Sequence, residues 1–437
     1  MATVPEPAAE DIEAIRRLSA FSLSRNALEY AFNIPYVTDH ILTHCTPGTL
    51  ARLAQTCRAF HNVVQAYSAS VFDINAHFRR FFDDPLGFRS LQARTGALVS
   101  GSNALQYFGR VVYEESDLDL YVKVEKVLEV GQWLIGTAGY QFEPNTRTQN
   151  QQPGISFEEA IRRVNRLHEY RPIHGLEGVY NLYKHVPGGE ANGTRRKIQL
   201  ITARYMPMDV ILNFHSTIVM NVISFDRAYS LYPYATFERR LGLHTPTCVG
   251  LSEEKPAFVQ KYRLRGWEMT NGSSELHSWH GLDQPPPHYS LPSSFRSQPR
   301  WIADRHSWVI RLPLDGVRVP AGKLGDPCYV TFWQLASLCN VNAWDQCSPA
   351  FCQISVGVEV YQHPEFAHKY AVADEKILII LSHVRSLARQ LQVGLPPHPG
   401  DDTLYAQRRR RAFQSLSVDL GGERCMEDVV SARYAGP

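Results

Sequence analysis

The chain has 437 residues, of which 44% are hydrophobic and 20% are charged. This is the composition of an ordinary globular protein and excludes a largely disordered, collagen-like or coiled-coil chain, and at roughly 150 residues per domain the length predicts about two to three domains. Lys and Arg number 45 and Asp and Glu 43, a formal charge of +2. Such a balance gives no electrostatic case for a dedicated nucleic-acid or membrane-surface binder.

The N-terminal segment 1–11 is acidic and rich in Pro and Ala, so it lacks the basic start and apolar run of a secretory signal. No apolar run approaches the roughly 18 residues of a membrane-spanning helix. The 8 cysteines are sparse, and their spacings match no zinc motif. We therefore expect a protein without a membrane segment, in a reducing compartment that is cytoplasmic or nuclear.

Residues 12–90 are predicted to form a compact helical module. Pro35 suits the first turn of a short helix that carries Ile41 and Leu42. Beyond Thr49 the spacing predicts one helix with a single apolar stripe. That stripe consists of Leu50, Leu53, Cys57, Phe60 and Val64.

From residue 96 the pattern changes to alternating strands and helices. A strand at 97–99, a helix to Phe108 and a strand at 117–122 are followed by helices over 125–136 and 156–167. Further strands are predicted over 179–186, 197–202, 308–312 and 354–360, and helices over 208–213 and 374–393. These elements predict an α/β core over 91–240, a C-terminal α+β extension over 241–395 and a mobile tail over 396–437.

One segment carries residues suited to chemistry. Gly101 and Ser102 follow the first strand of the core, and Asp117 and Asp119 lie on the next strand. Because residues i and i+2 of a strand point to the same face, the two carboxylates project together. Paired carboxylates repel each other unless a cation lies between them, and Mg²⁺ prefers such oxygen ligands. Glycine also lets a phosphate approach the start of the following helix.

This arrangement resembles the nucleotidyltransferase superfamily, the fold shared by DNA polymerase beta and the small antibiotic-modifying nucleotidyltransferases. The resemblance covers about residues 95–215 and implies that Gly101 and Ser102 bind the triphosphate of an NTP. It also implies that Asp117 and Asp119 are the catalytic metal ligands, with Mg²⁺ as cofactor. The family carries a third carboxylate on a later strand.

At the third position the sequence departs from the family. Within the strand 197–202, side-chain alternation places Gln199 where the family has Asp or Glu. Asp209 follows, but at a predicted helix start, where a capping role is expected. Without the third acid, activation of an acceptor hydroxyl is weakened, so nucleotide binding without transfer becomes an alternative to catalysis.

The N-terminal helices resemble an F-box. The segments 35–42 and 49–60 share with that motif a starting Pro, an Ile-Leu helix and a leucine-rich helix ending in Cys-Arg. The resemblance implies docking on a Skp-type adaptor of a ubiquitin ligase. The residues it assigns to adaptor binding are Pro35, Ile41, Leu42, Leu50 and Leu53.

The combination of both motifs is similar to a large group of proteins from mushroom-forming fungi, a resemblance that brings no established activity with it. The segments 214–217 and 232–233 are also similar to that group. His215 lies just beyond the candidate site and is a candidate pocket-lining residue. No serine-hydrolase elbow, Walker loop or dinucleotide-binding fingerprint is present.

Two hypotheses follow for this α+β chain. In the first, the protein is an F-box-like adaptor that recognises ubiquitin-ligase substrates, with a nucleotidyltransferase-like domain that is degenerate and serves for binding. In the second, it is a Mg²⁺-dependent enzyme that moves a nucleotidyl group from an NTP to a small molecule or a protein. Gln199 favours the first, and the intact Gly101-Ser102 and Asp117-x-Asp119 favour the second. Long nucleic acid is not expected as a partner, because the net charge is only +2.

Overall fold

The computed structural model describes residues 34–145, 152–164, 175–185, 195–204, 206–245, 257–270, 295, 300–321, 328, 331–338 and 353–360. The chain divides into two compact units, Met1–Val360 and Tyr361–Pro437, and the second lies outside the described residues. The predicted helix over 374–393 and the predicted tail therefore cannot be compared with it. Within the first unit the fold is α+β, as the sequence predicts.

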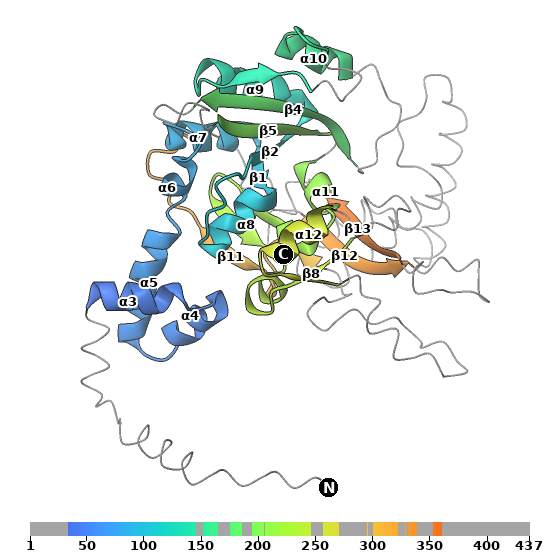
Figure 1. The fold of residues 1–437 in the computed structure, drawn as a ribbon. Helices are drawn as coiled ribbons and strands as arrows, with labels where there is room; N and C mark the ends of the chain where they lie inside the picture. The colour runs from blue at the N-terminus through green and yellow to red at the C-terminus, as the bar shows by residue number, and fades with distance from the viewer. Residues whose placement is uncertain are drawn as a thin grey trace, which may run out of the picture. The chain divides into compact units, whose positions relative to one another are not determined.

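The described chain starts with the helices α3 to α7, continues with mixed helices and strands, and ends in the strands β9 to β13 (Figure 1). The α-helices are α3 (Pro35–Thr43), α4 (Pro47–Ala54), α5 (Arg58–Val71), α6 (Ile74–Phe78), α7 (Pro85–Thr95), α8 (Gly101–Gly109), α9 (Val127–Gly136), α10 (Phe157–Val164), α11 (Pro207–Ile211) and α12 (Ala257–Leu264). The strands are β1 (Leu98–Ser100), β2 (Leu118–Lys123), β3 (Gln141–Glu143), β4 (Leu176–His185), β5 (Arg195–Ala203), β6 (Asn221–Ile223), β7 (Arg227–Ser230), β8 (Leu241–Leu243), β9 (Glu268–Thr270), β10 (Arg300–Trp301), β11 (Trp308–Arg311), β12 (Thr331–Leu338) and β13 (Gln353–Val360).

The main sheet has 8 strands in the order β11-β7-β6-β1-β2-β5-β4-β3. Strands β2 and β5 are parallel to each other, and every other neighbouring pair in this sheet is antiparallel. The sheet is therefore mixed. Since β11 pairs with β7, the strand predicted over 308–312 completes the same sheet as the strands that precede residue 240.

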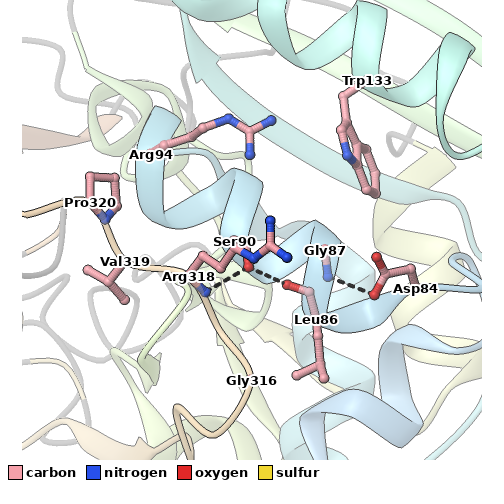
Figure 2. A pocket seen from close by; sticks show the side chains of 10 residues that line it. All are labelled: Asp84, Leu86, Gly87, Ser90, Arg94, Trp133, Gly316, Arg318, Val319 and Pro320. Atoms are coloured by element: carbon pink, nitrogen blue, oxygen red, sulfur yellow. Dashed lines mark hydrogen bonds between the residues drawn. The ribbon is translucent and has the colours of Figure 1, made fainter.

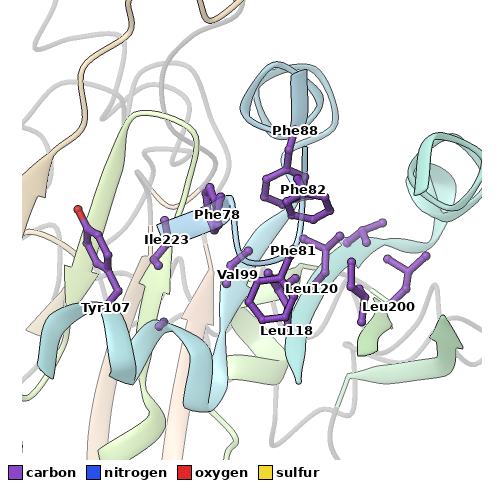
Figure 3. Packing of buried hydrophobic residues seen from close by; sticks show 14 of the residues in the cluster. Phe78, Phe81, Phe82, Phe88, Val99, Tyr107, Leu118, Leu120, Leu200 and Ile223 are labelled. Carbon is purple, nitrogen blue, oxygen red and sulfur yellow. The ribbon is translucent and has the colours of Figure 1, made fainter. Parts of the chain in front are cut away.

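The two faces of β2 enter different surroundings. Leu118, Leu120 and Val122 point into the largest core, where they meet the aromatic side chains of α6 and α7 (Figure 3). On the opposite face Tyr121 enters a second core beside α11, whereas Asp119 lies at the polar end of that face. Strand periodicity alone accounts for this division.

The helices α3, α4 and α5 enclose a small core of their own, formed by Leu42, Leu50, Val64 and Tyr67. The single helix expected from Thr49 onwards is wrong. Helix α4 ends at Ala54, and α5 starts at Arg58 after the extended residue Cys57. Just after α4, the N–H groups of Gln55 and Thr56 donate to the carbonyl oxygens of Arg52 and Leu53, which closes the final turn of the helix.

Two polar side chains connect this small helical core to the rest of the unit. Arg110 donates to the carbonyl oxygens of Leu42 (3.0 Å) and Cys45 (2.5 Å). Glu238 accepts from the hydroxyl of Thr46 (2.7 Å) and from the backbone N–H of Gly48 (2.7 Å), at the start of α4. A carboxylate at a helix N-terminus is stabilised by the free N–H groups there. Each charged group thus satisfies backbone or hydroxyl groups at a helix end.

Most of the other predicted elements are present. The predicted capping residue Ser156 accepts from the N–H of Glu159 at the start of α10 (3.1 Å). The predicted capping role of Asp209 is confirmed, because its carboxylate accepts from the N–H of Met206 (3.2 Å) at the start of α11. Among the helices of the described ranges, none is long and apolar enough to cross a membrane.

Candidate functional site

The turn between β1 and α8 requires glycine. Gly101 has φ of +69°, a conformation that side chains other than glycine rarely adopt. A Cβ atom at this position would lie 2.3 Å from Oδ2 of Asp119, far inside contact distance. The carboxylate of β2 therefore packs directly against the first residue of α8. Gly101 and Asp119, grouped in one candidate site from the sequence, lie next to each other in the folded chain.

Ser102 and Asp117 lie beside this contact but have protein partners. The hydroxyl of Ser102 is 2.7 Å from the hydroxyl of Ser116. Asp117 directly precedes β2, and its Oδ2 accepts from Nζ of Lys197 at 2.6 Å. Both of these sequence-predicted residues thus sit at the same end of the sheet as Asp119, and Asp117 is already paired with a cation.

The residue opposite Asp119 is Gln199. Strands β2 and β5 run parallel, and the register pairs Asp119 with Gln199, as the expected facing of the strand predicts. In the orientation that satisfies both ends of the amide, Nε2 of Gln199 donates to Oδ1 of Asp119 (3.1 Å) and Oε1 accepts from Nζ of Lys197 (3.0 Å). On the other side the amide lies 3.2 Å from Oδ1 of Asn181 on β4. Gln199 thus links the acid to the lysine.

Burial dominates the electrostatics of Asp119. Desolvation and the neighbouring Asp117 raise the pKa of Asp119 from 3.8 to about 7, and the ammonium groups of Lys197 and Lys261 oppose this rise. Lys261 belongs to α12, and its own pKa is lowered by burial and by Arg265. Two lysines from different elements therefore offset two carboxylates.

These donors do not fit a divalent magnesium ion. Mg²⁺ demands near-octahedral oxygen coordination and is usually held through one or two free carboxylates plus substrate phosphates. Here Asp117 is bonded to an ammonium group, and the third position is a neutral amide whose oxygen also faces that ammonium. Within the described ranges, no three His, Cys, Asp or Glu side chains are grouped so that they could hold a metal. The expected Mg²⁺ site thus keeps its two predicted carboxylates, but an ammonium lies on Asp117 and an amide takes the place of the third acid.

Helix α12 approaches the same end of the sheet through an aromatic contact. The ring of His215 stacks on Phe258 with centroids 3.9 Å apart, and His244 stacks on the same Phe258 at 5.2 Å. Burial lowers the pKa of His215 to about 4, with His244 adding to the effect. His215 therefore packs against α12 as a neutral ring near neutral pH.

The residues assigned to adaptor binding separate into two groups. Leu42 and Leu50 are buried in the helical core, and Leu53 is half-buried against it. Ile41 is 39% exposed on α3, and Pro35 is at the start of that helix. Tyr36, which sequence reasoning did not single out, is 81% exposed. On α3, therefore, Tyr36 and Ile41 are exposed, whereas Leu42 and Leu50 lie in the helical core.

A cavity of about 590 Å³ lies elsewhere, between α7, the Trp133 side chain of α9 and residues 316–320 (Figure 2). Ser90 closes its floor by donating to the carbonyl of Leu86 (2.7 Å) and accepting from the N–H of Arg318 (2.9 Å). None of the residues singled out in the sequence lines it. Arg94 at its edge is paired with Glu129 at 2.7 Å.

Sequence reasoning missed Lys197 and Lys261. Lys197 had a usable signal, because it lies two positions before Gln199 in one strand and must share its face. Lys261 had none, since α12 reaches the site only through tertiary contacts. Comparisons of the chain with protein-family models, with curated proteins and with solved structures find no match in any of the three.

Proposed function

We propose that the protein is an F-box-like adaptor whose nucleotidyltransferase-like domain binds a ligand rather than transferring a nucleotidyl group. One observation carries the proposal that this domain binds a ligand without transferring a nucleotidyl group. The residue in register with Asp119 is Gln199, a neutral amide that cannot serve as a base or as an anionic ligand. The adaptor role is supported by the separate core of α3, α4 and α5 and by the apolar side chains exposed on α3.

In this function the helical module is the docking element and the α/β body is the recognition element. Arg110 and Glu238 hold the two together through hydrogen bonds to the ends of α3 and α4. Such a fixed connection suits an adaptor, because a substrate bound to one element is then presented at a defined position relative to the other. A flexible tether would need no such contacts.

Co-purification with a Skp-type adaptor tests the proposal. The variant is Ile41→Asp, which places a charge on the exposed side of α3 without removing a side chain from the helical core. The matched control is Val112→Asp, an equally drastic change at a residue that is 63% exposed outside the module. We expect the adaptor to be retained by the wild type and the control and lost by the α3 variant. Equal retention by all three, or by none, would contradict the proposal.

A second candidate function is the nucleotidyltransferase itself. It is favoured by the contact between Gly101 and Asp119, since the glycine turn and the acid of that family's motif adjoin each other here. A nucleotide titration separates the two candidates. A rise in melting temperature with Mg²⁺-ATP or Mg²⁺-GTP that is lost in the Asp117→Asn, Asp119→Asn variant would favour the enzyme. No rise in either protein would favour the binding function.

A further inference from the structure

The cation nearest to the carboxylate pair is a side chain of the protein. Nζ of Lys197 lies 2.6 Å from Oδ2 of Asp117. It also lies 3.0 Å from the amide oxygen of Gln199, whose nitrogen bonds Asp119 at 3.1 Å. The side chains of Lys197 and Asp117 are only 24% and 33% exposed, so water screens their attraction less than that of a pair on the open surface.

The geometry leaves little for a divalent ion to bind. An ion bound to Asp117 would compete with the ammonium of Lys197, which would lose its carboxylate partner while partly buried. Oδ2 of Asp119 fills the space that a Cβ atom at Gly101 would take, so the carboxylate already lies against the turn before α8. Gln199 offers one neutral oxygen, and that oxygen already accepts from Lys197.

Among the residues that the structure describes, the elements around the pair add positive charge and no third acid grouped with it. Lys261 approaches from α12 and acts on both Asp117 and Asp119. Asn181, opposite Gln199 on β4, contributes a neutral amide. The two lysine side chains therefore offset the charge of the two acids without a metal ion.

We propose that Lys197 is a built-in counter-ion that takes the place of a metal at the Asp117–Asp119 pair, so that this site recognises its ligand without a divalent cation. The inference deepens the binding role proposed above, but it does not depend on docking to an adaptor. It accounts for two departures from the metal-binding pattern together, the amide at position 199 and the lysine two residues before it.

Binding of Mn²⁺ to the full chain, followed by electron paramagnetic resonance, tests this directly. We expect no saturable Mn²⁺ binding to the wild type. The double variant Lys197→Met, Gln199→Glu removes the ammonium and restores a third acid, and we expect it to gain one saturable site that binds at least about tenfold more tightly than any site of the wild type. The matched control Lys197→Arg, Gln199→Glu carries the same new acid but keeps a cation, and we expect it to gain none.

Three results would overturn the inference. One is saturable Mn²⁺ binding by the wild type that Asp119→Asn abolishes, a measurement that needs no redesigned site. Another is a double variant that melts cooperatively and still gains no site. The third is an equal gain in the arginine control. None of these changes the outcome of co-purification with the α3 variant, so failure of this inference and failure of the adaptor proposal are distinguishable.

Discussion

The two faces of the strands β2 and β5 are stabilised by different interactions. On one face Leu118, Leu120, Ile198 and Leu200 are fully buried in the main core. On the other face, at the same end of the strands, acids, a lysine and an amide satisfy one another by hydrogen bonds. The apolar face stabilises the fold through burial, and such a core tolerates exchanges between apolar side chains of similar volume. The polar face depends on each partner being present, because a half-satisfied buried network destabilises the fold.

Substitutions at neighbouring positions of β2 should therefore differ in sign as well as in size. The largest effect is expected on the apolar face. Leu120→Ala should lower the free energy of unfolding by about 2–5 kcal/mol, because it opens a cavity in the main core. Urea unfolding followed by circular dichroism measures this loss. Val112→Ala, at an exposed position, should change stability by less than about 0.5 kcal/mol. Similar losses for both would mean that Leu120 is not a core residue.

The next largest effect is expected where the polar face meets α8. Gly101→Ala should cost about 1–3 kcal/mol, since it combines a positive φ with a clash against the Asp119 carboxylate. Adding Asp119→Ala removes the clashing oxygen and should recover the steric part of the loss, leaving the cost of the backbone conformation. Thermal unfolding of the two single variants and the double variant measures this coupling. Strictly additive effects would show that the two residues do not touch.

A change of opposite sign is expected at Asp119 itself. Its pKa is raised from 3.8 to about 7, so the folded chain binds this proton more tightly than the unfolded chain does. The resulting stabilisation is fully present below pH 4 and is lost as the pH rises through about 7. Asp119→Asn should therefore stabilise the protein at pH 8 by at least about 1 kcal/mol, and less at pH 5. Melting temperatures at the two pH values test this, and destabilisation at pH 8 would contradict it.

The smallest effect is expected from the ion pair. Lys197→Gln leaves Asp117 without its cation but keeps a hydrogen-bond donor, and it should cost up to about 1 kcal/mol because the pair is partly exposed. The loss should shrink in 1 M salt, where charges are screened within about 3 Å. Comparison of melting temperatures at low and high salt measures the difference. A loss that is independent of salt would assign Lys197 a packing role instead.

Local pattern predicted much of the described fold. Alternation in β2 and β5 indicated which residues share a face, and the parallel register places Gln199 beside Asp119. The glycine and serine before a predicted helix correctly marked the start of α8. The capping role of Asp209 followed from its place at a helix start. These features depend on neighbours in the chain, so the sequence displays them.

The errors and omissions have two sources, a local break in a helix and contacts between distant segments. The stripe from Leu50 to Val64 suggested one helix, whereas α4 and α5 reach the same core from two directions after the turn at Cys57. Arg110 and Glu238 showed no sign in the sequence of holding helix ends more than 60 residues away. A helical repeat records which side chains are apolar, but not whether the chain turns back between them.

The net charge of +2 gave little indication of a binding site, and the structure explains why. By itself the sequence determined the α+β class, the glycine turn, the position of the acid pair and the absence of a third acid opposite it. Only the tertiary structure decided that lysines from β5 and α12 compensate those acids and that Asp119 is held against Gly101. The sequence gives the number of charged residues and the face of a strand on which each one lies. Whether two charges neutralise each other depends on the distance between segments that only folding brings together.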